Sequence, residues 1–331
     1  MNKSAMLTLI IKLVAFVLTP ILSICLSVSL FPFRFMDGDY AMYLQTYQKV
    51  HWGGDYRVLI LGDSSGKAGL IPTVLGDDVY NLAVGGFSPI EQYYYLSKYL
   101  EKSEPPECII LTYTPYHLMY APNLWDRAMY FHCFDLGDLK DIYAVIDDYE
   151  DVEYVKKEDY QWEVLEYSCY SPIKYSSAFV GGLVSGRRYK RNVEWYDFLT
   201  EHDGFSSFGE GDPHGLNYEV DYDHFHCSDL CEYYLKDMLE LCYEKGTTVI
   251  YETPPMNESS YNQMSQDFIY EYEDFLRGIN REYENLIVNE EWAFWEDNNF
   301  KDGRHLTMEG AEQYSNMIYN KYKNLFTGGQ S

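Results

Sequence analysis

The chain has 331 residues, 47% of them hydrophobic, so it can bury one substantial core with insertions or two modest domains, and we expect one. Its 25 Lys and Arg stand against 52 Asp and Glu, which gives a formal net charge of −27 at pH 7. A charge of this sign repels nucleic acid and excludes it as a partner. The 35 tyrosines suit both packed surfaces and stacking on sugar rings, which favours a carbohydrate ligand.

The N-terminus carries a segment that is long enough to cross a membrane. Residues 13–33 contain no charged side chain, and 21 residues are about the length of a bilayer-spanning helix. Lys3 and Lys12 precede this segment together with the free amine, whereas Asp37 and Asp39 follow it. The positive-inside rule therefore predicts a cytoplasmic N-terminus and an extracytoplasmic location for the rest of the chain.

A cleaved signal peptide is the alternative interpretation of this segment. Residues 27–29, Ser-Val-Ser, form a tolerable cleavage site of small residues. The apolar core of a signal peptide, however, is usually only about 7–15 residues long. We therefore expect residues 1–36 to be an uncleaved, single-pass anchor in the cell membrane.

After a connector over residues 37–55, which is expected to be helical around 43–50, strand and helix patterns alternate. The expected strands are 56–61, 78–82, 107–113, 247–251 and 285–289, and the expected helices are 66–75, 89–102, 228–245, 259–281 and 306–326. Strands that alternate with helices imply a parallel sheet covered on both faces. Residues 56–331 are therefore expected to form one α/β domain.

The alternation is lost between residues 114 and 225. This segment is rich in Tyr, Asp and Gly and contains helix-like pieces at 136–148 and 158–167. A structureless loop of this length is implausible in a compact domain, so we expect a folded insertion after the third strand. It carries a basic cluster at residues 187–191, for which contact with anionic lipid headgroups or polymer phosphates and a plain solvated surface are both open.

The stretch LILGDSSGKAGLIP, residues 59–72, raises the first question about function. A run of aliphatic residues there enters Gly62-Asp63-Ser64-Ser65-Gly66, which is either an ordinary turn or a serine held at a strand end for chemistry. Ligands of open parallel sheets bind outside the carboxyl ends of the strands. The answer therefore depends on what the other strand ends bring to the same edge.

Two further segments are expected at that edge. The second strand ends in a glycine-rich turn over residues 81–86, before a helix whose start is marked by a capping box at 88–91. Backbone N–H groups at a helix start can stabilise an anion. Residues 301–307 precede the last helix and carry Asp302 and His305. A nucleophile, an oxyanion site and a carboxylate–imidazole pair are thus predicted to meet.

These residues resemble the SGNH, or GDSL-type, hydrolase superfamily. Ser64 matches the nucleophile of its Gly-Asp-Ser block, and Gly86 matches the oxyanion glycine of its second block, which begins at Asn81. Asp302-x-x-His305 matches the Asp-x-x-His of its last block. The resemblance covers the sheet elements and implies a flavodoxin-like three-layer α/β/α sandwich with a central parallel sheet.

The resemblance implies the chemistry of a serine esterase. Asp302 would orient His305, which takes the proton from Ser64 Oγ as this atom attacks an ester carbonyl. The backbone N–H groups of Ser64 and Gly86 would hold the oxyanion, and the acyl group would pass to water or to a sugar hydroxyl. Ser65 is the rival nucleophile, but Ser64 directly follows Gly-Asp as in the family block. No cofactor or metal is expected.

One departure from the family concerns its third block, which places an Asn after the third strand as an oxyanion donor. No Asn stands there, and Thr114, Tyr116 and His117 are the candidates for the missing donor. Losing one such donor typically costs about 10²–10³ in rate.

An outward-facing domain of this type on one N-terminal anchor resembles bacterial proteins that modify envelope polymers. Examples are the D-alanyl-lipoteichoic acid biosynthesis proteins and the exopolysaccharide acetylation proteins that work beside a membrane-bound O-acyltransferase. The expected function is acyl transfer or ester hydrolysis on a cell-envelope polysaccharide or teichoic-acid-like polymer. The alternative is a non-catalytic envelope assembly or glycan-binding protein of the same fold, which the missing Asn and the many tyrosines favour and the intact triad disfavours.

A second group of residues, 224–231, contains metal-ligand residue types. Cys227 and Cys231 are four residues apart on one face of an expected helix start, and apolar residues up to Cys242 continue that face. No second Cys/His pair at zinc-finger spacing follows. Core packing is therefore expected, as for Cys108 in its own apolar stretch.

Overall fold

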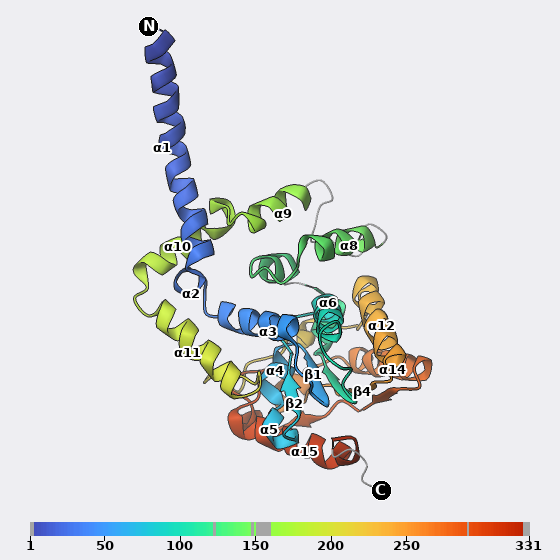
Figure 1. Cartoon of the computed structure of the whole chain (residues 1–331). Helices are drawn as coiled ribbons and strands as arrows, with labels where there is room; N and C mark the ends of the chain where they lie inside the picture. The colour runs from blue at the N-terminus through green and yellow to red at the C-terminus, as the bar shows by residue number, and fades with distance from the viewer. Residues whose placement is uncertain (1–2, 122–123, 147–148, 150–159, 290, 327–331) are drawn as a thin grey trace.

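The structure is a computed structural model of the whole chain and describes residues 3–121, 124–146, 149, 160–289 and 291–326. Helix α1 (Lys3–Leu30) projects from the rest of the molecule and is long and apolar enough to cross a membrane (Figure 1). It ends at Leu30, because Phe31 precedes Pro32 and a residue before proline disfavours the helical conformation. The short helix α2 (Pro32–Phe35) follows.

The segment expected as a connector contains helix α3 (Tyr40–Trp52). One side of this helix is buried, including Met42, Tyr43 and Val50. The chain that leaves α1 therefore enters the hydrophobic core directly.

The central sheet confirms the α/β prediction. Its strands are β1 (Val58–Gly62), β2 (Val79–Asn81), β3 (Cys108–Thr112), β4 (Thr248–Tyr251) and β6 (Leu286–Val288), at the five predicted places. They pair in parallel in the order β2-β1-β3-β4-β6. Strands β5 (Met256–Asn257) and β7 (Phe294–Trp295) form a separate two-stranded parallel sheet.

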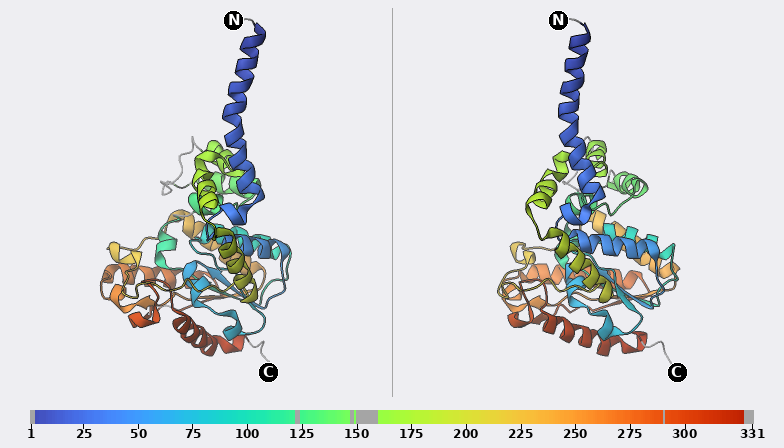
Figure 2. Two further views of the ribbon diagram at one scale, coloured as in Figure 1. Left: turned by 90° about the vertical axis from the view of Figure 1, so that its left-hand side faces the viewer. Right: turned by 60° about the vertical axis from the view of Figure 1, so that its left-hand side comes forward.

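Side chains alternate between the two faces of the sheet and enter two hydrophobic clusters. Leu59 and Leu61 belong to the cluster that includes residues of α3, α6 (Pro89–Leu100), α12 (Asp229–Glu244) and α14 (Gln266–Glu282). Val58 and Ile60 belong to the cluster that includes residues of α15 (Met308–Phe326). Figure 2 shows α15 at the end of the molecule opposite α1.

Two predicted helices are each divided in the structure. The helix predicted at 66–75 is α4 (Ser64–Gly69) followed by α5 (Pro72–Leu75), because Ile71 precedes Pro72 and is extended. The helix predicted at 259–281 is α13 (Glu258–Tyr261) followed by α14.

The insertion folds mainly as helices. These are α7 (Pro115–Met119), the π-helix η1 (Leu124–Met129), α8 (Leu136–Ile146), α9 (Tyr160–Ser168), α10 (Pro172–Val184), α11 (Arg188–Glu201) and the 3-10 helix η2 (Tyr218–Asp221). The two predicted helical pieces appear as α8 and α9, with residues 147–148 and 158–159 outside the described residues. Helix α10 packs on α1, and α11 packs on α2 and α3. The insertion therefore connects the N-terminal helix to the domain.

The cysteines predicted to be core residues are buried. Cys108 and Cys242 are each 1% exposed, and Cys227 and Cys231 lie in the main hydrophobic cluster. His224 is on the surface, where its Nδ1 is 3.0 Å from Glu271 Oε1. The prediction of core packing for residues 227–242 is confirmed.

Helix α4 contains a fully buried lysine, which predicts how stability depends on pH. Lys67 Nζ donates hydrogen bonds to the carbonyl oxygens of Asn81 (3.2 Å) and Gly204 (2.8 Å). Burial lowers the pKa of Lys67 to about 7, because the ammonium group loses its hydration. A lysine in the unfolded chain has a pKa of about 10.4. Between these two values the unfolded chain binds more protons, so the cost of burying this group falls and the fold becomes more stable as pH rises.

We expect the difference in free energy of unfolding between wild type and Lys67→Met to grow in favour of wild type as pH rises. The growth should be about 1 kcal/mol per pH unit between about pH 7.5 and 9.5. Denaturant titration of the full chain in detergent at several pH values measures it. Lys140→Met, on an exposed position of α8, is the matched control and should show no such trend. A pH-independent difference for Lys67→Met would contradict the assignment.

Candidate active site

The turn after β1 is shaped by close contact with β3. Gly62 has a φ of +134°, and a Cβ atom there would lie 1.7 Å from the carbonyl oxygen of Thr112. The Asp63 side chain then caps α4 by accepting a hydrogen bond from Ser65 N (2.8 Å). Ser64 is the first residue of α4, so its N–H has no acceptor within the helix.

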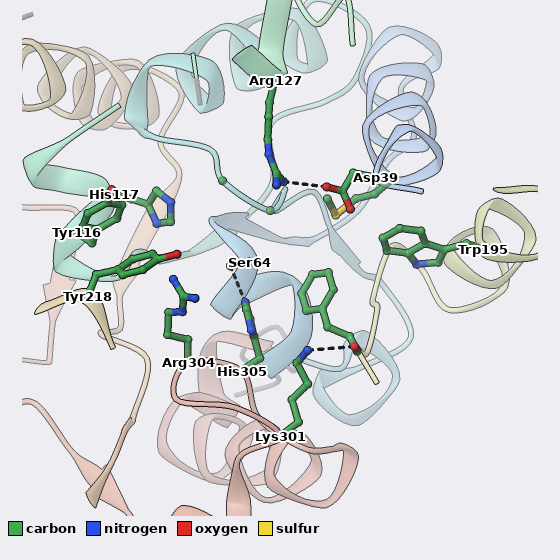
Figure 3. A pocket seen from close by; sticks show the side chains of 14 residues that line it. Asp39, Ser64, Tyr116, His117, Arg127, Trp195, Tyr218, Lys301, Arg304 and His305 are labelled. Carbon is green, nitrogen blue, oxygen red and sulfur yellow. Dashed lines mark hydrogen bonds and ion pairs between the residues drawn. The ribbon is translucent and has the colours of Figure 1, made fainter. Parts of the chain in front are cut away.

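Ser64, His305 and Asp302 form a hydrogen-bonded series, of which Figure 3 shows the Ser64–His305 contact. His305 Nε2 lies 2.9 Å from Ser64 Oγ, and His305 Nδ1 lies 3.0 Å from each carboxylate oxygen of Asp302. With Nδ1–H donating to the carboxylate, Nε2 is left as the acceptor for the hydroxyl proton. Ser64 and His305 are 241 positions apart in the chain. The three residues singled out in the sequence thus come together in the geometry of an activated nucleophile.

The carboxylate of Asp302 is held by several donors. The backbone N–H groups of Arg304 and His305 each donate to its Oδ1 at 2.9 Å, and Lys301 Nζ lies 3.1 Å from its Oδ2. Burial raises the pKa of Asp302. The hydrogen bond from His305, the charge of the His305 ring and the backbone N–H groups outweigh burial and hold this pKa far below its usual range. Asp302 therefore stays ionised and can orient His305.

Ser64 opens into a cavity of about 540 Å³, a size typical of ligand sites. The residues that line it are Asp39, Met42, Ser64, Gly85, Gly86, Tyr116, His117, Arg127, Trp195, Phe208, Tyr218, Lys301, Arg304 and His305. Ser65 is buried and does not belong to this lining. The geometry therefore favours Ser64 over Ser65 as the nucleophile.

The glycine-rich turn after β2 lies beside Ser64. A Cβ atom on Gly85 would be 3.6 Å from Ser64 Cβ, and Gly86 has a φ of +84°. The buried Tyr43 hydroxyl donates to the carbonyl oxygen of Gly85 at 2.7 Å. In a trans peptide the N–H points opposite to the carbonyl, so the Gly86 N–H points away from Tyr43. This orientation suits the predicted role of Gly86 as an oxyanion donor.

Two of the three candidates for the missing oxyanion donor contact Asp63 instead. Thr114 N and Oγ1 donate to Asp63 Oδ2 at 2.9 and 2.8 Å, so both donors of Thr114 are occupied. His117 Nδ1 lies 2.8 Å from the same oxygen, and its ring lines the cavity. Tyr116 also lines the cavity, and its backbone N–H donates to Glu219. Among the three candidates, His117 and Tyr116 thus line the cavity.

The Asp63–His117 pair was not anticipated from the sequence. Burial raises the pKa of Asp63, yet the hydrogen bond from His117, its charge and the backbone N–H groups of Thr114 and Ser65 together lower it. Asp63 is therefore an ionised, fully buried carboxylate that holds Nδ1 of His117, which leaves Nε2 as the ring nitrogen for a ligand. The cavity has one Asp–His pair beside the Ser64 hydroxyl and a second one on another wall.

The insertion supports the loop that carries His305. The carbonyl oxygen of Phe208 accepts a hydrogen bond from Lys301 Nζ (3.0 Å), and the Phe208 ring centroid is 4.9 Å from that of His305. Gly211 allows close packing here, since a Cβ atom there would lie 2.3 Å from the carbonyl oxygen of Lys301. The position of His305 beside Ser64 therefore depends on residues outside the matched blocks.

Several cavity residues carried no readable sequence signal. Asp39 pairs with Arg127 at 2.9 Å across the cavity wall, and only folding brings this pair together. The Arg304 guanidinium lies 3.7 Å from the Tyr218 ring centroid and has no carboxylate within ion-pair distance among the described residues. Arg304 was within reach of a sequence argument, because it stands beside His305 in the last block.

No protein-family model matches this chain, and no curated protein matches it. The resemblance to SGNH hydrolases therefore rests on the sequence blocks and on the geometry described above.

Proposed function

We propose that this protein performs serine-dependent acyl transfer or ester hydrolysis on a cell-envelope polysaccharide or teichoic-acid-like polymer. The observation that carries the proposal is the Ser64 Oγ–His305 Nε2 distance of 2.9 Å, with Asp302 on the other ring nitrogen. The strand order β2-β1-β3-β4-β6 supports the SGNH assignment, because it is the 2-1-3-4-5 order of flavodoxin-like three-layer sandwiches.

The reaction would begin with attack of Ser64 Oγ on an ester carbonyl as His305 takes the hydroxyl proton. The N–H groups of Ser64 and Gly86 would stabilise the oxyanion, and His305 would return the proton to the leaving alcohol. Water or a sugar hydroxyl would then attack the acyl-serine. Transfer and hydrolysis share these residues and differ only in the acceptor.

The cavity lining supports a glycan that carries negative charge. Trp195 and Tyr116 offer aromatic surfaces on which sugar rings can stack. Among the lining cations Arg127 pairs with Asp39 and Lys301 with Asp302, which leaves Arg304 with no ion-pair partner among the described residues, in a chain whose net charge is −27. Local positive charge in a strongly acidic protein attracts an anionic substrate.

The location that we propose is extracytoplasmic, with α1 as a single-pass anchor and its N-terminus in the cytoplasm. Lys3 and Lys12 at the start of α1 support this orientation. A membrane-bound O-acyltransferase would be the source of acyl groups for transfer.

Covalent labelling with a fluorophosphonate probe tests the proposal. Intact-mass analysis of the full chain in detergent should show one adduct on wild type and on Ser65→Ala, and none on Ser64→Ala or His305→Ala. Ser65→Ala is the matched control, because it removes the neighbouring hydroxyl only. Absence of an adduct on well-folded wild type would refute an activated serine and favour a non-catalytic assembly or glycan-binding role.

His117→Ala should lower the rate of labelling and kcat for a small ester by about 10²–10³, with little change in KM, if His117 supplies the third oxyanion donor. Nε2 can donate only when the ring is protonated, since Nδ1 already donates to Asp63. Tyr116→Phe is the control; a larger effect there would assign the donor to Tyr116.

A further inference from the structure

Helix α1 is covered by protein only near its C-terminal end. Residues 3–23 are exposed along their whole length, whereas from Ile24 onward one side of the helix is covered and Val28 is fully buried. Helix α10 packs against this part, and Figures 1 and 2 show α10 beside the lower end of α1. The opposite side of α1 remains apolar and exposed at Leu26 and Leu30.

Helices α10 and α11 are fixed to the end of the apolar segment. A Cβ atom on Gly182 would lie 2.7 Å from the carbonyl oxygen of Arg34, so α10 touches the α2 backbone. Arg188 Nη1 donates to the carbonyl oxygen of Phe35 at 2.7 Å. The Asn192 side chain donates to the carbonyl oxygens of Phe33 and Met36 at 3.0 and 3.1 Å. The position of α10 is therefore set relative to α1.

The length of the uncharged segment places this contact at the membrane. A helix rises about 1.5 Å per residue, so the 21 uncharged residues from 13 to 33 match a hydrocarbon core of about 30 Å. Lys12 opposes moving the span toward the N-terminus, because a charge in the bilayer is costly. The segment that contacts α10, around Val28, therefore lies near one edge of the hydrocarbon layer.

Helix α10 presents an apolar face that no described residue covers. Ile173, Val180, Leu183 and Val184 are 75%, 55%, 56% and 78% exposed and recur at helical spacing. The other face is buried on α1 and α2, and the polar residues on the exposed face are the uncharged Ser176 and Ser177. Its one charged side chain, Lys174, pairs with Glu163 at 2.6 Å. A helix of this kind is found inside a protein or in contact with lipid.

A basic cluster follows directly at the end of α10. Arg187, Lys190 and Arg191 are exposed, and they are concentrated here in a chain with a net charge of −27. Basic side chains next to an apolar face suit the headgroup level of a membrane that contains anionic lipids. The charges are on the same elements that contact the end of the membrane segment.

We propose that the exposed face of α10 and the basic cluster at 187–191 form a surface that docks on a lipid bilayer containing anionic lipids. The apolar side chains enter the outer part of the acyl-chain region, and the basic side chains contact the headgroups. Asp39 and Met42, which line the cavity, follow α2 within a few residues. Docking therefore keeps the Ser64 cavity close to the membrane surface and at a set orientation.

Photo-cross-linking of the full chain in nanodiscs tests this surface. The nanodiscs would contain phosphatidylcholine and phosphatidylglycerol with a phospholipid that carries a diazirine on its acyl chain, and peptide mass spectrometry would locate the adducts. We expect adducts on α1 and on Ile173, Val180, Leu183 or Val184. Met308 is 48% exposed and belongs to α15, the helix at the end of the molecule opposite α1 (Figure 2), so it should carry none.

Val180→Asp/Val184→Asp should lower the α10 adducts at least fivefold while those on α1 remain, and Met308→Asp is the matched control. Thermal unfolding followed by circular dichroism reports that each variant is folded. Adducts on α1 with none on wild-type α10 would overturn the proposal. The proposal would also be overturned if the chain alone gave no lipid adducts on α10 and a copurifying membrane protein protected this helix. That result would favour a protein partner for the exposed face of α10.

Discussion

His305→Ala should lower kcat/KM for a small activated ester by roughly 10³–10⁴, because it removes the group that takes the proton from Ser64. His305 Nε2 contacts Ser64 Oγ directly, at 2.9 Å. No other described side chain forms a hydrogen bond with Ser64 Oγ that could take over this role. The measurement is steady-state hydrolysis of a chromogenic acetyl ester by the full chain in detergent. Asp302→Asn should give a loss of similar size, since the ring would no longer be held in the productive tautomer.

His224→Ala is the matched control for this experiment. His224 also lies beside a carboxylate, Glu271, but on the surface and outside the Ser64 cavity. It should keep wild-type activity. Wild-type activity in His305→Ala would show that the measured hydrolysis does not come from this site.

Gly62→Ala should destabilise the fold by at least about 4 kcal/mol or prevent folding. The new Cβ would lie 1.7 Å from the backbone oxygen of Thr112 in β3, which cannot move without breaking the β1–β3 pairing. The φ of +134° adds strain for any residue with a Cβ. Denaturant titration and the yield of folded protein measure the effect.

Gly278→Ala is the control for the effect of an added methyl group. Gly278 is within α14, and nothing lies within 4 Å of the position that its Cβ would take. Alanine there should be neutral or stabilise the helix by up to about 1 kcal/mol. A Gly62→Ala protein that folds with near wild-type stability would mean that the strand-end geometry tolerates other residues.

Both predictions bear on Ser64, the first through its contact with His305 and the second through the turn that carries it. Gly62 allows β1 to pass close to β3, and this close contact places Asp63 where it can accept from Thr114. Ser64 then starts α4 at the cavity. The glycine of the Gly-Asp-Ser block thus serves the backbone, the aspartate orders the turn and the neighbouring strand end, and the serine faces the cavity.

Much of the sheet was predictable because its signals are local. Each of the five strands is a short apolar run bounded by turn residues, and the capping box at 88–91 marks the start of α6. The prediction missed that two helices are divided. One of these divisions also has a local cause, because Ile71 precedes Pro72 and is extended. The helices of the insertion were predicted only in part, since the sequence analysis anticipated the pieces that became α8 and α9 but not α7, α10 or α11.

By itself, the sequence determined the parallel α/β class, the apolar N-terminal segment and the candidates Ser64, Asp302 and His305, because these depend on periodicity, length and motifs within a few residues. Only the tertiary structure decided that His117 binds Asp63 and that α10 packs on the end of α1. Such contacts join residues far apart in the chain, and their formation depends on packing and burial that no local pattern records. The cavity lining that the insertion provides also depends on contacts between residues far apart in the chain.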